Sequence, residues 1–157
     1  MLFHASIPAD EPERVARFLA ALWRGRVLPF PVFARSFMAM AEDARGTEIE
    51  VTPRSLEQIP GPEEVTTREN PAPSPYGATH LALGSKLSED EILTLAAREG
   101  WTARVCDRGG VFHVVEVWLE NKFLIEVLTE AFQREYLAAM TFGRMRSLFE
   151  TPPAGPA

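Results

Sequence analysis

Two histidines and two glutamates recur at one interval along this chain. Glu50 follows His4 by 46 positions (50 − 4), and Glu126 follows His80 by the same 46 (126 − 80). Each of the four lies in a short apolar run, where a carboxylate is costly unless it is paired, protonated or bound to a metal ion. Two imidazoles and two carboxylates suit a divalent metal such as Zn, Fe, Ni or Mn. The repeat therefore predicts one metal site built from two equivalent halves.

Side-chain alternation in the surrounding strands supports this prediction. Successive residues of a strand point to opposite faces of the sheet. In each of four predicted strands the candidate ligand lies opposite the bulky apolar residues that a helix would cover. Those apolar residues are Phe3, Ile7, Ile49, Val51, Leu81, Leu83, Ile125 and Val127. All four ligands are thus expected on the faces that no helix covers.

A further strand, residues 111–119, is expected to contribute the rest of the site. Its alternation places Glu116 on the ligand side, as a candidate general base or substrate contact. Phe112 and Trp118 fall on the same side and are expected to form apolar walls for the substrate. His113 falls on the helix side and is left out of the site, although a one-residue bulge would reverse that assignment.

The order β-α-β-β-β occurs twice in the pattern of apolar residues and turn signals. The first module covers residues 1–53, with strands expected at 2–8, 26–33, 36–42 and 47–53. The second module covers residues 78–129, with strands expected at 78–84, 101–107, 111–119 and 122–129. Each first strand leads into a helix, which is expected to open with a capping box: Asp10 with Glu13, and Ser88 with Glu91. We expect an α+β fold in which the modules form a cupped, mostly antiparallel eight-stranded sheet, within one domain of residues 1–157.

Two segments lie outside the modules. Residues 54–77 are rich in proline and polar residues and are interpreted as a surface linker, with a lid as the alternative. Residues 130–150 are interpreted as a C-terminal helical extension whose apolar face would pack on its own domain or on a second subunit. That face would consist of Phe132, Tyr136, Leu137 and Met140. The tail 151–157 is expected to fray.

Composition excludes several classes of partner. The chain has 157 residues, a net charge of −6 and no cluster of Lys and Arg, so nucleic acid is not an expected partner. No run of about 18 apolar residues is present, so no membrane span is expected. The N-terminal stretch lacks the basic region of a signal peptide. The single cysteine, Cys106, is interpreted as a small buried residue and fits a cytoplasmic location.

These motifs together resemble the vicinal oxygen chelate superfamily, which includes glyoxalase I, extradiol dioxygenases, and fosfomycin- and bleomycin-resistance proteins. The resemblance covers roughly residues 1–130. It depends on FHASIPADEPERVARFLAAL for the first strand and helix, and on IEVT, THLAL and NKFLIEVL for later strands. The stretches VLPFP and GTEIEVTPR are similar to those of a bacterial branch of the superfamily.

The resemblance implies two different ligand sets. The glyoxalase pattern places metal ligands at His4, Glu50, His80 and Glu126, whereas the extradiol dioxygenase pattern uses His4, His80 and Glu126 alone. The chain lacks a convincing match to the glutathione-binding residues of glyoxalase I. It also lacks the acid/base histidine of the extradiol enzymes and has half their usual length. The two patterns therefore differ only in whether Glu50 is a metal ligand.

Three functions follow as hypotheses. The first is a metal-dependent lyase, isomerase or ring-cleaving dioxygenase, whose small substrate binds the metal through vicinal oxygens. Glu126, Glu50 or Glu116 would move the proton. The second is a metal-free binding or resistance protein that holds a flat ligand on Trp118, Phe112 and Phe33. The third is a structural dimer without a metal site. A homodimer is expected, with the modules paired within one chain or exchanged between two.

Overall fold

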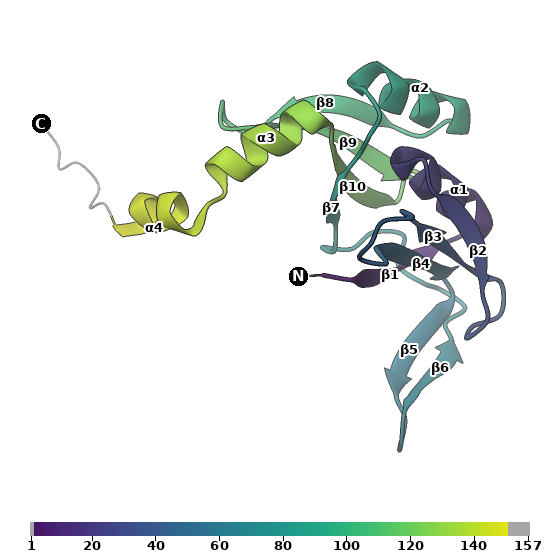
Figure 1. Ribbon diagram of the computed structural model, residues 1–157. Coiled ribbons are helices and arrows are strands. Elements are labelled where there is room, and N and C mark those ends of the chain that lie inside the picture. Colours follow the sequence, from purple (N-terminus) through teal and green to yellow (C-terminus); the bar gives the residue numbers. More distant parts are fainter. Residues whose placement is uncertain (1, 151–157) are drawn as a thin grey trace, which may run out of the picture.

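Residues 2–150 are described by a computed structural model, and they repeat one module twice (Figure 1). The first module consists of β1 (His4–Ala9), α1 (Pro12–Trp23), β2 (Arg26–Phe30), β3 (Ser36–Met40) and β4 (Glu48–Pro53). The second consists of β7 (Leu81–Gly84), α2 (Glu89–Glu99), β8 (Ala103–Asp107), β9 (His113–Leu119) and β10 (Phe123–Leu128). The α+β class and both β-α-β-β-β modules are thereby confirmed. The expected fraying of residues 151–157 lies outside the described residues.

The two modules have the same sheet topology. The strand order is β1-β4-β3-β2 in the first and β7-β10-β9-β8 in the second, and in each the first and last strands of the module run parallel. Across residues 2–150 these eight strands form two four-stranded sheets, and no pairing joins them into the single eight-stranded sheet that was expected. The modules instead share one apolar core, and β1 and β7 each lie at the edge of their own sheet.

One apolar core spans both modules and includes residues from both sheets and from α1 and α2. Helix α1 covers the first sheet and also contacts the second module. The ring of Phe18 lies 4.9 Å from that of Trp101, which follows α2. The indole N–H of Trp23 donates a hydrogen bond to the carbonyl oxygen of Gly84, at 3.0 Å. The N-terminal helix therefore fixes how the two modules sit relative to each other.

A second connection between the modules is ionic, and we call Asp10, Arg54, Glu120 and Lys122 the inter-module clasp. Arg54 Nε lies 2.8 Å from Asp10 Oδ1, and Arg54 Nη2 lies 3.2 Å from Glu120 Oε2. Lys122 also binds Asp10. Burial alone would raise the pKa of Asp10, but the hydrogen bonds from Lys122 and Arg54 outweigh it and lower the pKa.

The clasp also replaces the expected N-cap of α1. Glu11 occupies the N-cap position and makes no side-chain capping bond. The carboxylate of Glu120 accepts hydrogen bonds at 2.7 Å from the backbone N–H groups of Asp10 and Glu11 instead. The predicted Asp10 capping box is therefore wrong, because Asp10 is engaged by the cations of the clasp. The box at Ser88 and Glu91 is confirmed.

The segment between the modules contains a β-hairpin, β5 (Leu56–Pro60) and β6 (Val65–Glu69), which pair antiparallel. It projects from the body at the bottom of Figure 1. Residues 54–77, interpreted as a linker because of their prolines, thus include a regular hairpin.

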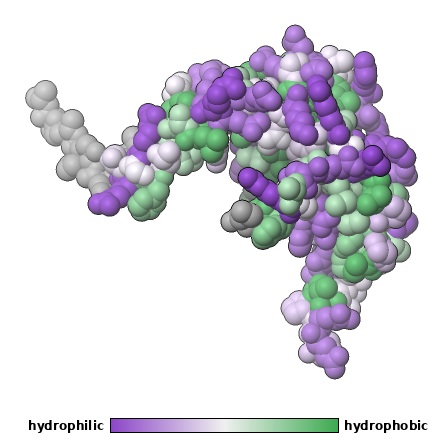
Figure 2. All heavy atoms as spheres, viewed as in Figure 1, coloured by the Kyte–Doolittle hydropathy of each residue, from purple (hydrophilic) through white to green (hydrophobic). Residues whose placement is uncertain are grey.

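The C-terminal extension forms two helices, α3 (Glu130–Ala139) and α4 (Phe142–Glu150), of which α4 lies away from the body in Figure 1. Phe132 stacks on His113, whose Nδ1 lies 2.9 Å from Glu135, and this hydrogen bond raises the pKa of His113. Leu137 and Phe142 are exposed, and Figure 2 shows hydrophobic residues on this part of the surface. Within residues 2–150, no helix has both the length and the apolar character needed to span a membrane.

Candidate metal and substrate site

The first half of the candidate site lies on β1 and β4. Ser6 is the register partner of Glu50, and its hydroxyl donates a hydrogen bond to the Glu50 carboxylate. His4 is two residues before Ser6 and therefore shares its face of the sheet. The face opposite carries buried Ile7 and Val51, as the alternation predicted. His4 and Glu50 thus share the face that α1 leaves uncovered.

The second half repeats this arrangement on β7 and β10. Ala82 is the register partner of Glu126, and His80 is two residues before Ala82. His80 lies just before the first residue of β7, so the strand is shorter than expected. In both modules the histidine is therefore two residues ahead of the glutamate's partner. The interval of 46 positions corresponds to one repeated register.

A single chain displays these residues as two half-sites, His4 with Glu50 and His80 with Glu126. Both histidines are exposed. No group of three or more His, Cys, Asp or Glu side chains in residues 2–150 is placed to hold a metal ion. The donor types fit a divalent metal, but the halves must come together before all four can coordinate one ion.

An ionic network covers the second half-site. Glu116 and Glu126 are cross-strand partners on β9 and β10, and Arg104 on β8 is the next partner in the same row. Arg104 Nη2 lies 2.7 Å from Glu116 Oε2, and Arg108 Nη2 lies 2.9 Å from Glu116 Oε1. Arg108 also binds Glu126 directly. Two guanidinium groups therefore neutralise the two carboxylates.

The network keeps Glu116 ionised. Burial alone would raise the pKa of Glu116, but the hydrogen bonds from Arg108 and Arg104 outweigh it and lower the pKa. A general base works best with a pKa near the working pH. The lowered pKa favours a role for Glu116 in positioning the arginines, and its assignment as a base stays a prediction.

The pH dependence of stability is expected to reflect this pair of hydrogen bonds. Because the pKa of Glu116 is lowered from its ordinary value of 4.5, its stabilising effect is present above that value and is lost as the pH falls through the folded-state pKa. Urea unfolding of the wild type and of Glu116→Gln, measured from pH 3 to pH 7, would show this. The stability difference between the two should be constant above about pH 5.5 and shrink below it. A difference independent of pH would contradict the ionic role.

The equivalent row of the first sheet has a different character. Leu28 and Met38 stand in that row, beside Glu50, where the second sheet has Arg104 and Glu116. The two half-sites therefore share a histidine and a glutamate but not their neighbours. One side of an assembled site would be apolar and the other ionic.

The predicted apolar walls are only partly exposed. Phe112 packs edge-on against Tyr136 of α3, with ring centroids 5.1 Å apart, so the C-terminal extension reaches this end of the sheet. Trp118 is half-buried beside its register partner Leu124. Phe33 contacts Phe30 in the first module. Their assignment as substrate contacts stays a prediction.

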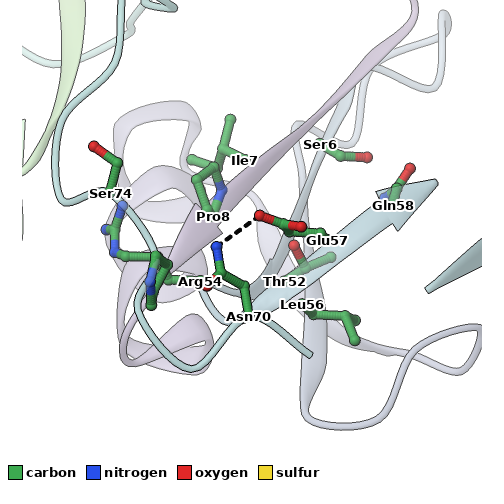
Figure 3. A pocket seen from close by; sticks show the side chains of 11 residues that line it. Ser6, Ile7, Pro8, Thr52, Arg54, Leu56, Glu57, Gln58, Asn70 and Ser74 are labelled. Carbon is green, nitrogen blue, oxygen red and sulfur yellow. Dashed lines mark hydrogen bonds between the residues drawn. The ribbon is translucent and has the colours of Figure 1, made fainter. Parts of the chain in front are cut away.

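A cavity of about 370 Å³ adjoins the first half-site, between the open face of the first sheet and the hairpin (Figure 3). Ser6 lines it from β1, and Glu57 and Gln58 line it from β5. Asn70 Nδ2 donates a 2.7 Å hydrogen bond to Glu57, drawn as the dashed line. Since Ser6 also binds Glu50, the cavity lies next to a candidate ligand and is lined by groups that suit a polar small molecule.

Sequence reasoning missed the importance of Arg108 for the site. Its signal was weak, because Arg108 is in the turn before β9 and outside the predicted strands. Arg104 could have been found, since strand alternation and hairpin pairing place it opposite Glu116.

Solved structures with the same fold are found, although no family model and no curated protein matches the sequence. The fosfomycin resistance protein FosX of Listeria monocytogenes, complexed with Mn(II) and sulfate, has a TM-score of 0.56 and 11% identity, covering 88% of this chain and 96% of that one. FosX from Mesorhizobium loti has a TM-score of 0.50 and 13% identity, covering 85% and 94%. An integron cassette protein from V. cholerae has a TM-score of 0.50 and 14% identity, covering 83% and 94%.

These similarities show that this chain shares the fold of the FosX fosfomycin resistance proteins. At such low identity the similarities show a shared fold but not a shared activity.

Proposed function

We propose that this protein is a metal-dependent enzyme of the glyoxalase or dioxygenase type, acting on a small substrate that binds a divalent metal through vicinal oxygens. The observation that supports the proposal is the repeated register: in each module a histidine is two residues ahead of the register partner of a glutamate. A structural role for these four residues gives no reason for the repeat. The Mn(II) bound by a FosX neighbour is consistent with it.

Each residue has a distinct role in this proposal. His4 and His80 would ligate through neutral imidazole nitrogens, and Glu126 would add a carboxylate. Glu50 would be the fourth ligand in lyase or isomerase chemistry and would stay free in ring cleavage. The metal, when bound, supplies Lewis-acid stabilisation of negative charge on the substrate oxygens. Ser6 orients the Glu50 carboxylate through its hydrogen bond.

A homodimer would unite the half-sites. The free edges of β1 and β7 lie beside the histidines of the two halves, and backbone groups on a free edge can pair with another strand. We propose that the first module of one chain meets the second module of its partner there. The exposed Leu137 and Phe142 of the extension provide further apolar surface for such a contact.

Metal affinity tests this proposal. Calorimetric titration of chelator-treated protein with Mn(II) is expected to show stoichiometric binding. Since loss of an outer-shell partner costs 10- to 100-fold, removal of a ligand in Glu126→Gln should weaken binding at least about 100-fold. Glu50→Gln should weaken it similarly if four residues ligate, and little if three do. Glu13→Gln, on the exposed surface of α1, is the matched control and should leave affinity unchanged.

The dimer arrangement has its own readout in the same experiment. One chain carries His4→Ala with Glu50→Gln, and the other carries His80→Ala with Glu126→Gln. If modules pair across chains, an equimolar mixture should regain on the order of a quarter of the sites, because half of randomly formed dimers are mixed and each has one intact site. No recovery after subunit exchange would contradict pairing across chains.

A metal-free binding protein is the second candidate. The observation in its favour is the ion pair of Arg108 with Glu126, which satisfies that carboxylate without a metal. Absence of stoichiometric transition metal in the purified protein, even after supplementation, would favour it over the enzyme.

A further inference from the structure

Arg108 is held so that its side chain reaches back over the second half-site. It lies in the turn between β8 and β9, where Gly109 and Gly110 both have positive φ and the backbone N–H of Arg108 donates to Phe112 O at 2.8 Å. From this turn its Nη2 binds both Glu116 and Glu126. It is the one residue in the described network that contacts both the candidate metal ligand and the neighbouring carboxylate.

Metal binding would unbalance this network. Arg104, Arg108, Glu116 and Glu126 together carry no net charge. A divalent ion on Glu126 places two positive charges beside the guanidinium of Arg108, and like charges at such distances repel. Glu126 would leave Arg108 for the metal, while the 2.9 Å bond to Glu116 could persist. Glu116 alone would then face two guanidinium groups, which leaves an unmatched positive charge.

We propose that Arg108 exchanges Glu126 for the substrate, so that it recognises a carboxylate or phosphate group beside the two metal-binding oxygens. This inference rests on the proposed metal site and narrows its substrate class to small oxyanions. Guanidinium groups bind such oxyanions through paired, charge-assisted hydrogen bonds. The Arg108 side chain is 32% exposed, so a ligand can reach it without unfolding the turn.

Arg104 provides a matched control. It binds the same Glu116 but, within residues 2–150, forms no ion pair with Glu126, and its side chain is 62% exposed. Substituting Arg104 removes one positive charge from the same ionic network while leaving the candidate metal ligand untouched. The two arginines therefore separate a local role at Glu126 from a general charge effect.

The test is calorimetric titration of Arg108→Gln, Arg104→Gln and wild type, first with Mn(II) and then, at saturating Mn(II), with inorganic phosphate or acetate. Arg108→Gln should bind Mn(II) about tenfold more tightly, because the competitor for Glu126 is gone, and its metal form should bind the oxyanion about tenfold more weakly. Arg104→Gln should stay within about threefold of wild type in both titrations. Phosphate and acetate distinguish the two kinds of anionic group.

The outcomes separate this inference from the proposed function. If wild type and Arg108→Gln bind Mn(II) and the oxyanions equally, the metal site stands and the role of Arg108 is overturned. If neither protein binds Mn(II), the proposed function fails and this inference fails with it. Arg108→Lys keeps the positive charge but loses the paired hydrogen bonds of the guanidinium group, so its oxyanion affinity should be intermediate. This variant also controls for a folding defect in Arg108→Gln.

Discussion

Replacing Trp101 with alanine is expected to lower the free energy of unfolding by about 4 kcal/mol. Trp101 is 6% exposed, its ring lies 4.9 Å from that of Phe18 in a tilted arrangement, and the guanidinium of Arg14 lies 5.5 Å from the ring centroid. Truncation removes a large apolar surface from the core and leaves a cavity where α1 meets the second module. Urea unfolding followed by far-ultraviolet circular dichroism measures the loss without depending on the missing indole.

Phe142→Ala is the control for this prediction. Phe142 is an aromatic residue on exposed α4, so its removal should change the stability of the monomer by less than about 0.5 kcal/mol. A loss below about 1 kcal/mol for Trp101→Ala would show that the contact between Trp101 and Phe18 does not hold the modules together.

Replacing Arg54 with methionine is expected to cost about 3 kcal/mol. The side chains of Arg54 and Glu120 are only 7% and 9% exposed, so the substitution leaves a buried carboxylate without its cation. Burying an unpaired charge is expensive, although a paired buried charge adds little net stability. Methionine keeps most of the side-chain volume, so the loss measured by urea unfolding reports the charge and not a cavity.

Arg17→Met separates this effect from the loss of any arginine. Arg17 pairs with Glu13 on the exposed face of α1, and such helix pairs contribute about 0.5 kcal/mol or less. The double variant Arg54→Met with Glu120→Gln should recover part of the loss, since the unpaired charge is then gone. Equal losses in Arg54→Met and Arg17→Met would rule out the clasp as a stabilising connection.

Features that depend on local pattern could be predicted from the sequence. The alternation of apolar and polar residues along β1, β4 and β10 is visible within a few positions. It was therefore enough to predict on which face of the sheet His4, Glu50 and Glu126 lie. The Ser88 capping box was equally local, because both partners lie within one helical turn. At the C-terminus of α1, Arg24 takes the left-handed conformation that glycine usually adopts.

Gly25 is required for a reason that no local pattern shows. A Cβ atom on Gly25 would lie 1.9 Å from the carbonyl oxygen of Met40, so the constraint comes from a strand 15 residues away (40 − 25). The cap supplied by Glu120 and the ion pair between Arg108 and Glu126 are likewise contacts between distant segments. Such contacts follow from the packing of the modules, which the strand patterns do not specify. The hairpin β5–β6 was not predicted, because the prolines of this segment are typical of a linker.

The C-terminus of α1 has a consequence for how variants of this protein should be interpreted. The carbonyl oxygen of Leu22 accepts hydrogen bonds from the hydroxyl of Ser85 and the backbone N–H of Lys86, just after the strand that His80 precedes. The end of one helix thus holds the segment next to the second half-site, while its own module carries His4. A substitution of Ser85 would remove its hydrogen bond to this carbonyl and so loosen the segment beside His80 without touching a ligand. In a mutational screen such a position would score as a functional residue, although its role is only to hold the backbone beside the site in place.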